Sequence, residues 1–194
     1  MNYPIKVKIE DKEYPINTDF RVAIECNSIA MDTEIGDYER ALAIIYKLFG
    51  DKGLEDKQNH CKLLELGQKY LLCGKELNQD IKQDEIDMDF EQDMDYIEAS
   101  FMSDYNIDLA NTEMHWWKFY NLMNGLSNSE IGNCCVLNRV RNLRNYDTSE
   151  IKDVKERTKI EKAKQQVALK KKVKPLTKEQ QESAERFNKL AGIS

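Results

Sequence analysis

Three residues in the first half of the chain, His60, Cys61 and Cys73, have side chains that commonly bind zinc. Structural zinc sites space their ligands regularly, whereas this trio is an adjacent pair followed by a long gap. The five cysteines of the chain contain no C-x-x-C pair and are odd in number, which argues against a disulfide framework. We therefore expect reduced thiols that pack as small hydrophobes in a cytosolic protein, and no zinc centre.

An acidic stretch and a second histidine are the remaining candidates for chemistry. Residues 84–95 carry carboxylates at alternate positions, as a calcium loop does, but lack the glycine at its sixth position. Phe90, Met94 and Ile97 indicate a helix there instead, and carboxylates near a helix start suit its dipole. His115 precedes two tryptophans on an apolar helix face, which favours a packed or surface histidine. No phosphate loop, nucleophile elbow or dinucleotide motif is present, so we expect no catalysis and no cofactor.

The elements that position these residues are expected to be helices. Of the 194 residues, 41% are hydrophobic and 33% charged, and the scarcity of glycine (8) and proline (3) argues against many short strands. Ile5, Val7 and Ile9 alternate with charged residues before a polar turn and Tyr14-Pro15-Ile16, which predicts a short N-terminal hairpin. No apolar stretch approaches the roughly 20 residues that cross a bilayer. The prediction is a mainly α multi-helix bundle with no membrane span.

Apolar residues at three- and four-residue spacing predict six helices in the body, over residues 19–31, 37–49, 55–73, 89–105, 112–124 and 127–143. The residues expected to cap three of them are Asn17 or Thr18, Asn111 or Thr112, and the pair Ser127 and Glu130. The residues expected to end four of them are Gly50, Gly74, Asn106 and Gly125. Residues 75–87 are polar with little periodicity, which indicates an exposed connection.

One hydrophobic core is expected, with the hairpin packed on it. Its expected members are Phe20, Ile24, Leu42, Ile45, Leu64, Ile97, Phe101 and Trp116. Trp116 and Trp117 are adjacent, so their side chains point about 100° apart on a helix. One of them is expected to pack inside, and the other to lie at a helix–helix seam or at a partner surface, where tryptophan is a frequent anchor.

The composition changes beyond Asp147, where residues 152–178 are dense in Lys and Arg. Sparse apolar positions predict a long helix that ends before Pro175, followed by a short helix over 177–190. We therefore divide the chain into a helical body with the hairpin, residues 1–147, and a basic helical arm, residues 148–194. Lysines are costly to desolvate, so the arm is expected to project.

Partner contact is expected from Trp117 and from the cations of the arm. The cations are Lys152, Lys155, Arg157, Lys159, Lys162, Lys164, Lys170, Lys171 and Lys172. A basic helix of this kind can dock on an acidic partner, on the acidic face of another copy, or on nucleic-acid phosphates. The alternative is a charged helix that is simply solvated.

Four sequence blocks, in order, resemble the phage protein family named for gene product fifteen, found in tailed phages and prophages of Gram-positive bacteria. They are residues 13–21 (EYPINTDFR), 89–101 (beginning DFEQD), 115–119 (HWWKF) and 151–157 (beginning IKD). The likeness covers about residues 7 to 170, and the acidic-aromatic block followed by His-Trp-Trp is its most specific part. The chain departs from the family pattern after about Leu169, where a lysine-rich tail follows.

The resemblance implies a gene among tail genes, near those of the major tail protein and the tape-measure protein, and hence a tail-assembly chaperone without a catalytic residue. A tape-measure protein is a long helical chain whose apolar stripes would aggregate before tube subunits surround it. A helical protein can cover such stripes by helix-in-groove contacts.

The expected partners are therefore the tape-measure protein and other tail proteins, in the host cytoplasm and not in the mature virion, with a homo-oligomer as a further option. The runner-up is a structural tail or head–tail connector component retained in the virion, and a nucleic-acid-binding accessory protein is third.

Overall fold

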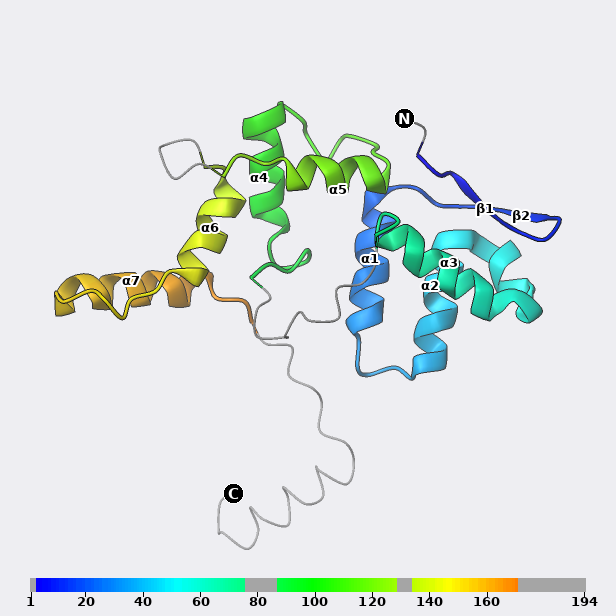
Figure 1. Cartoon of the computed structure of the whole chain (residues 1–194), viewed down its shortest axis with the longest axis horizontal. Helices are drawn as coiled ribbons and strands as arrows, with labels where there is room; N and C mark the ends of the chain where they lie inside the picture. Colours follow the sequence, from blue (N-terminus) through cyan, green and yellow to red (C-terminus); the bar gives the residue numbers. More distant parts are fainter. Residues whose placement is uncertain (1–2, 76–86, 129–133, 171–194) are drawn as a thin grey trace, which may run out of the picture.

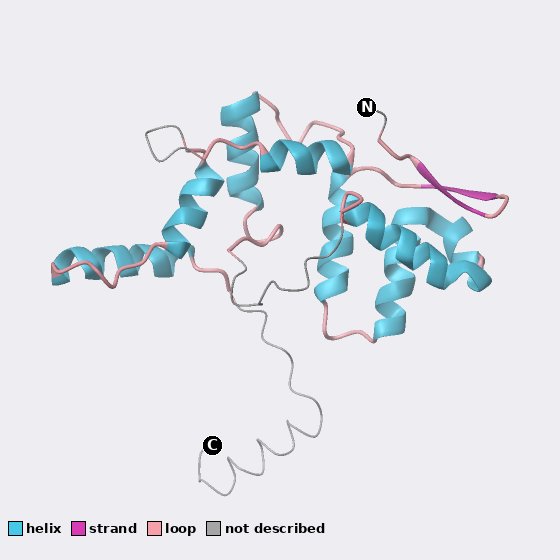
Figure 2. Ribbon diagram, viewed as in Figure 1, coloured by secondary structure: helices cyan, strands magenta, loops and turns pink. Residues whose placement is uncertain are grey.

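The computed structural model describes residues 3–75, 87–128 and 134–170. Within these ranges the chain forms a two-stranded antiparallel hairpin and seven α-helices (Figure 2). The fold is thus mainly α with an N-terminal hairpin, as the sequence predicts.

The predicted hairpin is confirmed. β1 (Lys6–Ile9) pairs with β2 (Lys12–Pro15) in an antiparallel register that places apolar side chains on one face. Tyr14 on that face is fully buried, and its hydroxyl donates to Asp56 Oδ2 at 2.6 Å. Hydrogen bonds from Lys12 and Tyr14 hold the pKa of the Asp56 carboxyl well below its usual range. This carboxylate therefore fastens the hairpin to the helical body.

The first helix, α1 (Phe20–Met31), has a different cap from the one predicted. Asp19 occupies the N-cap position, and its Oδ1 accepts a hydrogen bond from Arg21 N at 2.8 Å. Thr18, a predicted cap, instead uses its backbone oxygen to accept from Trp116 N at 2.7 Å. The cap thus lies at Asp19, and the residue before it is bound to the start of the fifth helix.

The second helix, α2 (Asp37–Glu55), is interrupted at Gly50, whose φ of 64° and ψ of −160° are not helical. The sequence marked Gly50 correctly as a left-handed position, which glycine adopts without steric cost. The chain then re-enters a helix, whereas the prediction ended it there. The 3-10 turn η1 (Lys57–Asn59) leads into α3 (His60–Leu71), and Gly74 follows with a φ of 73°.

The next helix, α4 (Met94–Tyr105), begins later than predicted because a separate turn precedes it. In that turn Asp89 Oδ1 accepts hydrogen bonds from the backbone N–H groups of Glu91 and Gln92, at 3.0 and 2.9 Å. Asn106 ends α4 in the left-handed conformation, as the sequence predicts, with a φ of 53°. The carboxylate at position 89 therefore caps a turn.

Two further helices, α5 (Trp116–Asn124) and α6 (Val136–Asn145), also begin later than predicted. His115 caps α5 and Cys135 caps α6, where Cys135 Sγ accepts from Asn138 N at 3.4 Å. The predictions of Asn111, Thr112 and Ser127 as helix caps were wrong. Glu130, the other half of the predicted capping box, lies outside the described residues.

One hydrophobic core joins the hairpin with helices α1 to α6. Near its centre the ring of Phe119 stacks on Phe20 at 4.5 Å and on Phe101 at 5.1 Å. The predicted core members that are buried are Phe20, Ile24, Ile45, Ile97, Phe101 and Trp116. Leu64 packs partly buried at the core's edge. Leu42 is only half-buried and is not a core residue, so its assignment was wrong.

The last helix, α7 (Val154–Val167), projects past α6 at the end of the molecule opposite the hairpin (Figure 1). It is shorter than predicted, because the backbone leaves the helix at Ala168. Residues 146–153 run outward and α7 returns beside them, with Lys164 Nζ donating to Tyr146 O. No residue of α7 is buried. The helix predicted over 177–190 lies outside the described residues.

Candidate interaction surfaces

His115 opens α5 as its N-cap, a role that we did not predict because caps are usually Ser, Thr, Asn or Asp. Its Nδ1 accepts a hydrogen bond from Trp117 N at 3.0 Å, and its Nε2 lies 3.0 Å from Pro4 O. A neutral ring with its proton on Nε2 satisfies both partners. Tyr3 stacks on the ring at 4.9 Å. His115 therefore ties the start of α5 to the segment before the hairpin.

The two adjacent tryptophans both bind the C-terminal end of α3. Trp116 Nε1 donates to Leu71 O and Trp117 Nε1 donates to Tyr70 O, each at 2.9 Å. The last carbonyl groups of a helix have no partner within it, and the indole of Trp116 satisfies that of Leu71. Tyr70 O also accepts from Cys73 N at 3.0 Å, so Trp117 adds a further hydrogen bond to it. Trp116 is buried as predicted, and Trp117 lies half-buried at the seam, with its ring 6.2 Å from Tyr70. A contact of Trp117 with a partner protein stays a prediction.

A buried ion pair holds the base of the arm. Asp93 is fully buried, and Arg144 of α6 binds both of its carboxylate oxygens, at 2.6 and 2.8 Å. Such a bidentate pair is strong and geometrically specific. The same guanidinium donates to Asp87 O at 2.8 Å and to Val167 O at the end of α7 at 2.6 Å. Arg144 therefore connects α4, α6 and the returning end of the arm.

A second contact fixes the chain just beyond α7. The side-chain amide of Gln92 donates to Lys170 O at 3.2 Å and accepts from Lys170 N at 2.8 Å. The Gln92 side chain thus makes with the Lys170 backbone the paired hydrogen bonds that two residues exchange between antiparallel strands. The described part of the arm, residues 148–170, is thus attached to the body at both of its ends, while α7 itself lies exposed.

The two sides of α7 differ in character. At about 100° per residue, Ile160, Ala163 and Val167 fall on one side, and all three are half-buried. Lys155, Lys159 and Lys162 fall together on an adjoining side, and all three are exposed. Within the described ranges, none of these three lysines forms an ion pair. We call Lys155, Lys159 and Lys162 the lysine stripe.

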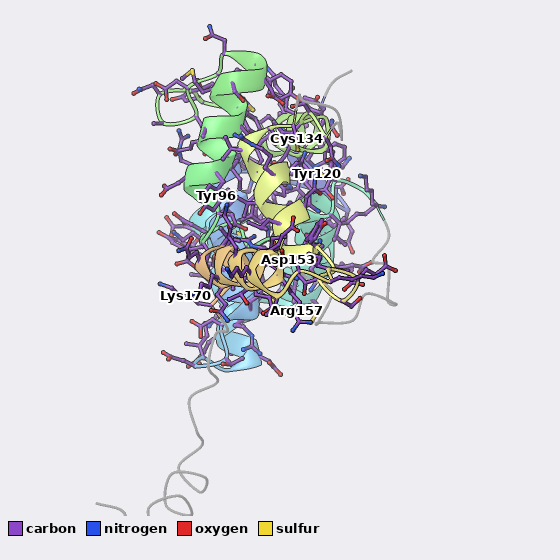
Figure 3. All side chains as sticks on the ribbon, turned by 90° about the vertical axis from the view of Figure 1, so that its left-hand side faces the viewer. Tyr96, Tyr120, Cys134, Asp153, Arg157 and Lys170 are labelled. Atoms are coloured by element: carbon purple, nitrogen blue, oxygen red, sulfur yellow. The ribbon has the colours of Figure 1, made fainter. Side chains whose placement is uncertain are left out.

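The remaining cations predicted for partner contact are not on this stripe. Arg157 Nε lies 3.7 Å from Glu161 Oε1, Lys164 is bound to backbone, and Lys152 precedes the helix. In Figure 3, which views α7 nearly end-on, Arg157 and Lys170 lie on different sides of the arm. The cations that lie outside the described residues are Lys171 and Lys172. The structure also separates Trp117 from the arm, because α3 and α7 lie at opposite ends of the molecule (Figure 1).

A groove runs between α1 and the start of α4, and we did not predict it. It encloses about 520 Å³ and is lined mainly by apolar atoms, with Ile24, Ile29 and Met94 among its lining residues. A Glu25–Lys47 ion pair of 2.5 Å lies at one edge. The sequence analysis placed Ile24 in the core, because periodicity cannot show where two apolar helix faces stop short of each other.

The thiols of the described residues are all free. Burial raises the pKa of Cys26 to about 12 and that of Cys73 to about 11, which makes both poor nucleophiles at neutral pH. In the part of the chain that the structure describes, no three His, Cys, Asp or Glu residues form a group that could hold a metal ion. None of the described helices is long and apolar enough to span a bilayer.

Comparison with known proteins connects these features to one family. The chain matches none of the curated proteins and none of the solved structures. A family model described as bacteriophage Gp15 protein matches residues 2–169, which include all the helices described above. The match ends where the sequence was seen to depart from the family pattern. The chain belongs to the bacteriophage Gp15 family.

Proposed function

We propose that the protein is a tail-assembly chaperone. It binds the tape-measure protein, the tail-tube protein, or both. Binding takes place in the host cytoplasm while a long tail is built. It is absent from the mature virion and catalyses no reaction. The observation that carries the proposal is the apolar groove between α1 and α4 in a protein of a phage family.

The groove has the form expected of a site for an amphipathic helix. Apolar side chains line the groove together with the charged residues Glu25, Lys47 and Glu91. Interfaces between proteins commonly have an apolar centre and a polar rim. Burying one large apolar side chain there contributes about 1.5–3 kcal/mol, so two or three give binding that remains reversible. A tape-measure helix needs its apolar stripe to be covered reversibly, until tube subunits replace the chaperone.

Two methionines of α4 provide a matched test of this site. Met94 lines the groove, whereas Met102 is exposed on the same helix and is not among the groove's lining residues. Met94→Lys places a charge in the apolar site and should abolish co-purification of the tape-measure protein of the same phage. Met102→Lys should leave it intact. Equal binding by both variants would show that the groove is not the site.

Mass spectrometry of purified virions separates the chaperone from the runner-up, a structural tail or connector component. A chaperone should be absent, while a structural component should be present at a fixed copy number. A nucleic-acid-binding accessory protein, the third reading, would show steep salt-dependent retention on DNA.

A further inference from the structure

We propose that the lysine stripe of one copy docks on the outer face of α2 of a second copy, so that the protein associates with itself head to tail. The docking face is defined by Tyr38, Glu39, Leu42 and Tyr46, and we call it the tyrosine face. This contact is independent of the groove and of the proposed chaperone function.

The tyrosine face is a partly exposed surface of α2 that carries two large aromatic side chains. Tyr38 is 68% exposed and Tyr46 49% exposed, and Leu42 between them is half-buried. At 3.6 residues per turn these three side chains and Glu39 occupy about 100° of the helix circumference. Large apolar side chains of a soluble protein gather on one surface more often where a partner binds.

The two surfaces carry opposite charge. Residues 31–39, which lead into the tyrosine face, contain four carboxylates and no Lys or Arg. Arg40 on α2 pairs with Asp37, one of these four, and Lys47 pairs with Glu25. Three carboxylates of the segment, Asp32, Glu34 and Glu39, therefore form no ion pair within the described residues. Conversely, residues 152–178 contain eleven Lys or Arg and three carboxylates, a net charge of 11 − 3 = +8. Because the whole chain carries −6, the rest carries −6 − 8 = −14, and attraction between arm and body of two copies is favoured.

The spacing of the two surfaces also agrees. Lys155 and Lys162 are seven residues apart, about 10 Å along α7, while Tyr38 and Tyr46 are about 12 Å apart along α2. Each ammonium group can therefore lie over a tyrosine ring or beside Glu39 while its aliphatic stem covers Leu42. Contacts between a lysine ammonium group and a tyrosine ring also occur within the described part of this chain.

Two such lysine–tyrosine contacts occur within the chain. Lys75 Nζ lies 4.9 Å from the ring centre of Tyr120, and Lys52 Nζ lies 5.7 Å from that of Tyr14. The exposed Val154 at the start of α7 adds an apolar contact beside the stripe. Since the stripe and the face are different surfaces, each copy offers one of each, and the association forms rings or filaments.

Sedimentation velocity of the full-length protein tests the contact. At low ionic strength the parent should form dimers and larger species that dissociate as salt is added. The triple variant Lys155→Glu, Lys159→Glu and Lys162→Glu should self-associate at least about tenfold more weakly, because three exposed cation contacts are lost. A control with the same change of net charge reverses three exposed lysines elsewhere, Lys57, Lys69 and Lys118, and should associate like the parent.

A charge swap identifies the docking face. The variant Glu34→Lys with Glu39→Lys should also fail to associate alone, and mixing it with the triple lysine variant should restore association. Tyr38→Ser with Tyr46→Ser, which leaves all charges in place, should weaken association as well. A monomeric parent at low salt, a failed rescue, or lysine variants that lose only retention on DNA would each overturn the proposal.

Discussion

Replacing Arg144 with Met should destabilise the protein by about 3–5 kcal/mol, the usual cost of leaving a buried charge without its partner. The Asp93 carboxylate is 0% exposed and the Arg144 side chain only 10% exposed, so water cannot replace the lost guanidinium. Asp93 would retain one donor, the backbone N–H of Asp89 at 3.0 Å. Since small domains are stable by about 5–15 kcal/mol, the substitution should remove a large fraction of the total.

A double substitution separates the ion pair from general packing. Asp93→Leu combined with Arg144→Met removes both charges, so its cost should be smaller than that of Arg144→Met alone. The bond from Arg144 to Val167 O is lost in both variants. In both, therefore, backbone amides at the end of α7 should exchange hydrogen faster than in the parent protein.

Urea unfolding followed by circular dichroism gives the free energies. Arg141→Met is the matched control, because Arg141 pairs with Asp87 in the same region but both side chains are more exposed, 38% and 23%. That pair should contribute about 1 kcal/mol or less. If Arg144→Met costs no more than Arg141→Met, the assignment of the Asp93 pair as the attachment of the arm is refuted.

Three further outcomes are expected. Truncating the buried Phe101 or Trp116 to Ala should each cost about 3–5 kcal/mol in urea unfolding, and parental melting of both variants would contradict the core described above. Under native conditions a thiol reagent at neutral pH should modify the exposed Cys61 first and spare Cys26, whose pKa is about 12, as peptide mass mapping would show. Deleting residues 151–194 should leave the helical body folded by circular dichroism, because α7 contributes no buried residue; a truncated protein that fails to fold would place the arm in the core.

The amino-acid sequence by itself determined the kinds of element and many of their ends. Alternation of apolar residues predicted the hairpin, and three- and four-residue spacing predicted the helices. Gly50 and Asn106 were correctly identified as left-handed positions, because glycine and asparagine tolerate that conformation. These features depend on interactions between residues close in the chain, and so periodicity and residue type suffice to predict them.

Long-range contacts, which only the tertiary structure shows, lie at the start of two helices. Asp19 caps α1 while the backbone of the preceding Thr18 is bound to α5, and His115 caps α5 while its other nitrogen binds the segment before the hairpin. A residue-type rule for caps considers only the local chain. Here the competing hydrogen bonds come from residues about 100 positions away, which no local pattern contains.

The ion pair, the groove and the tyrosine face also depend on contacts between residues far apart in the chain, and so the sequence did not predict them. The carboxylates of residues 84–95 resembled a calcium loop in type, and only the folded chain shows that Asp93 pairs with Arg144, 51 residues later. Ile24 of the groove and Leu42 of the tyrosine face were both predicted to be core residues. Periodicity gives the direction in which an apolar side chain points, whereas the packing of the other helices decides whether anything covers it.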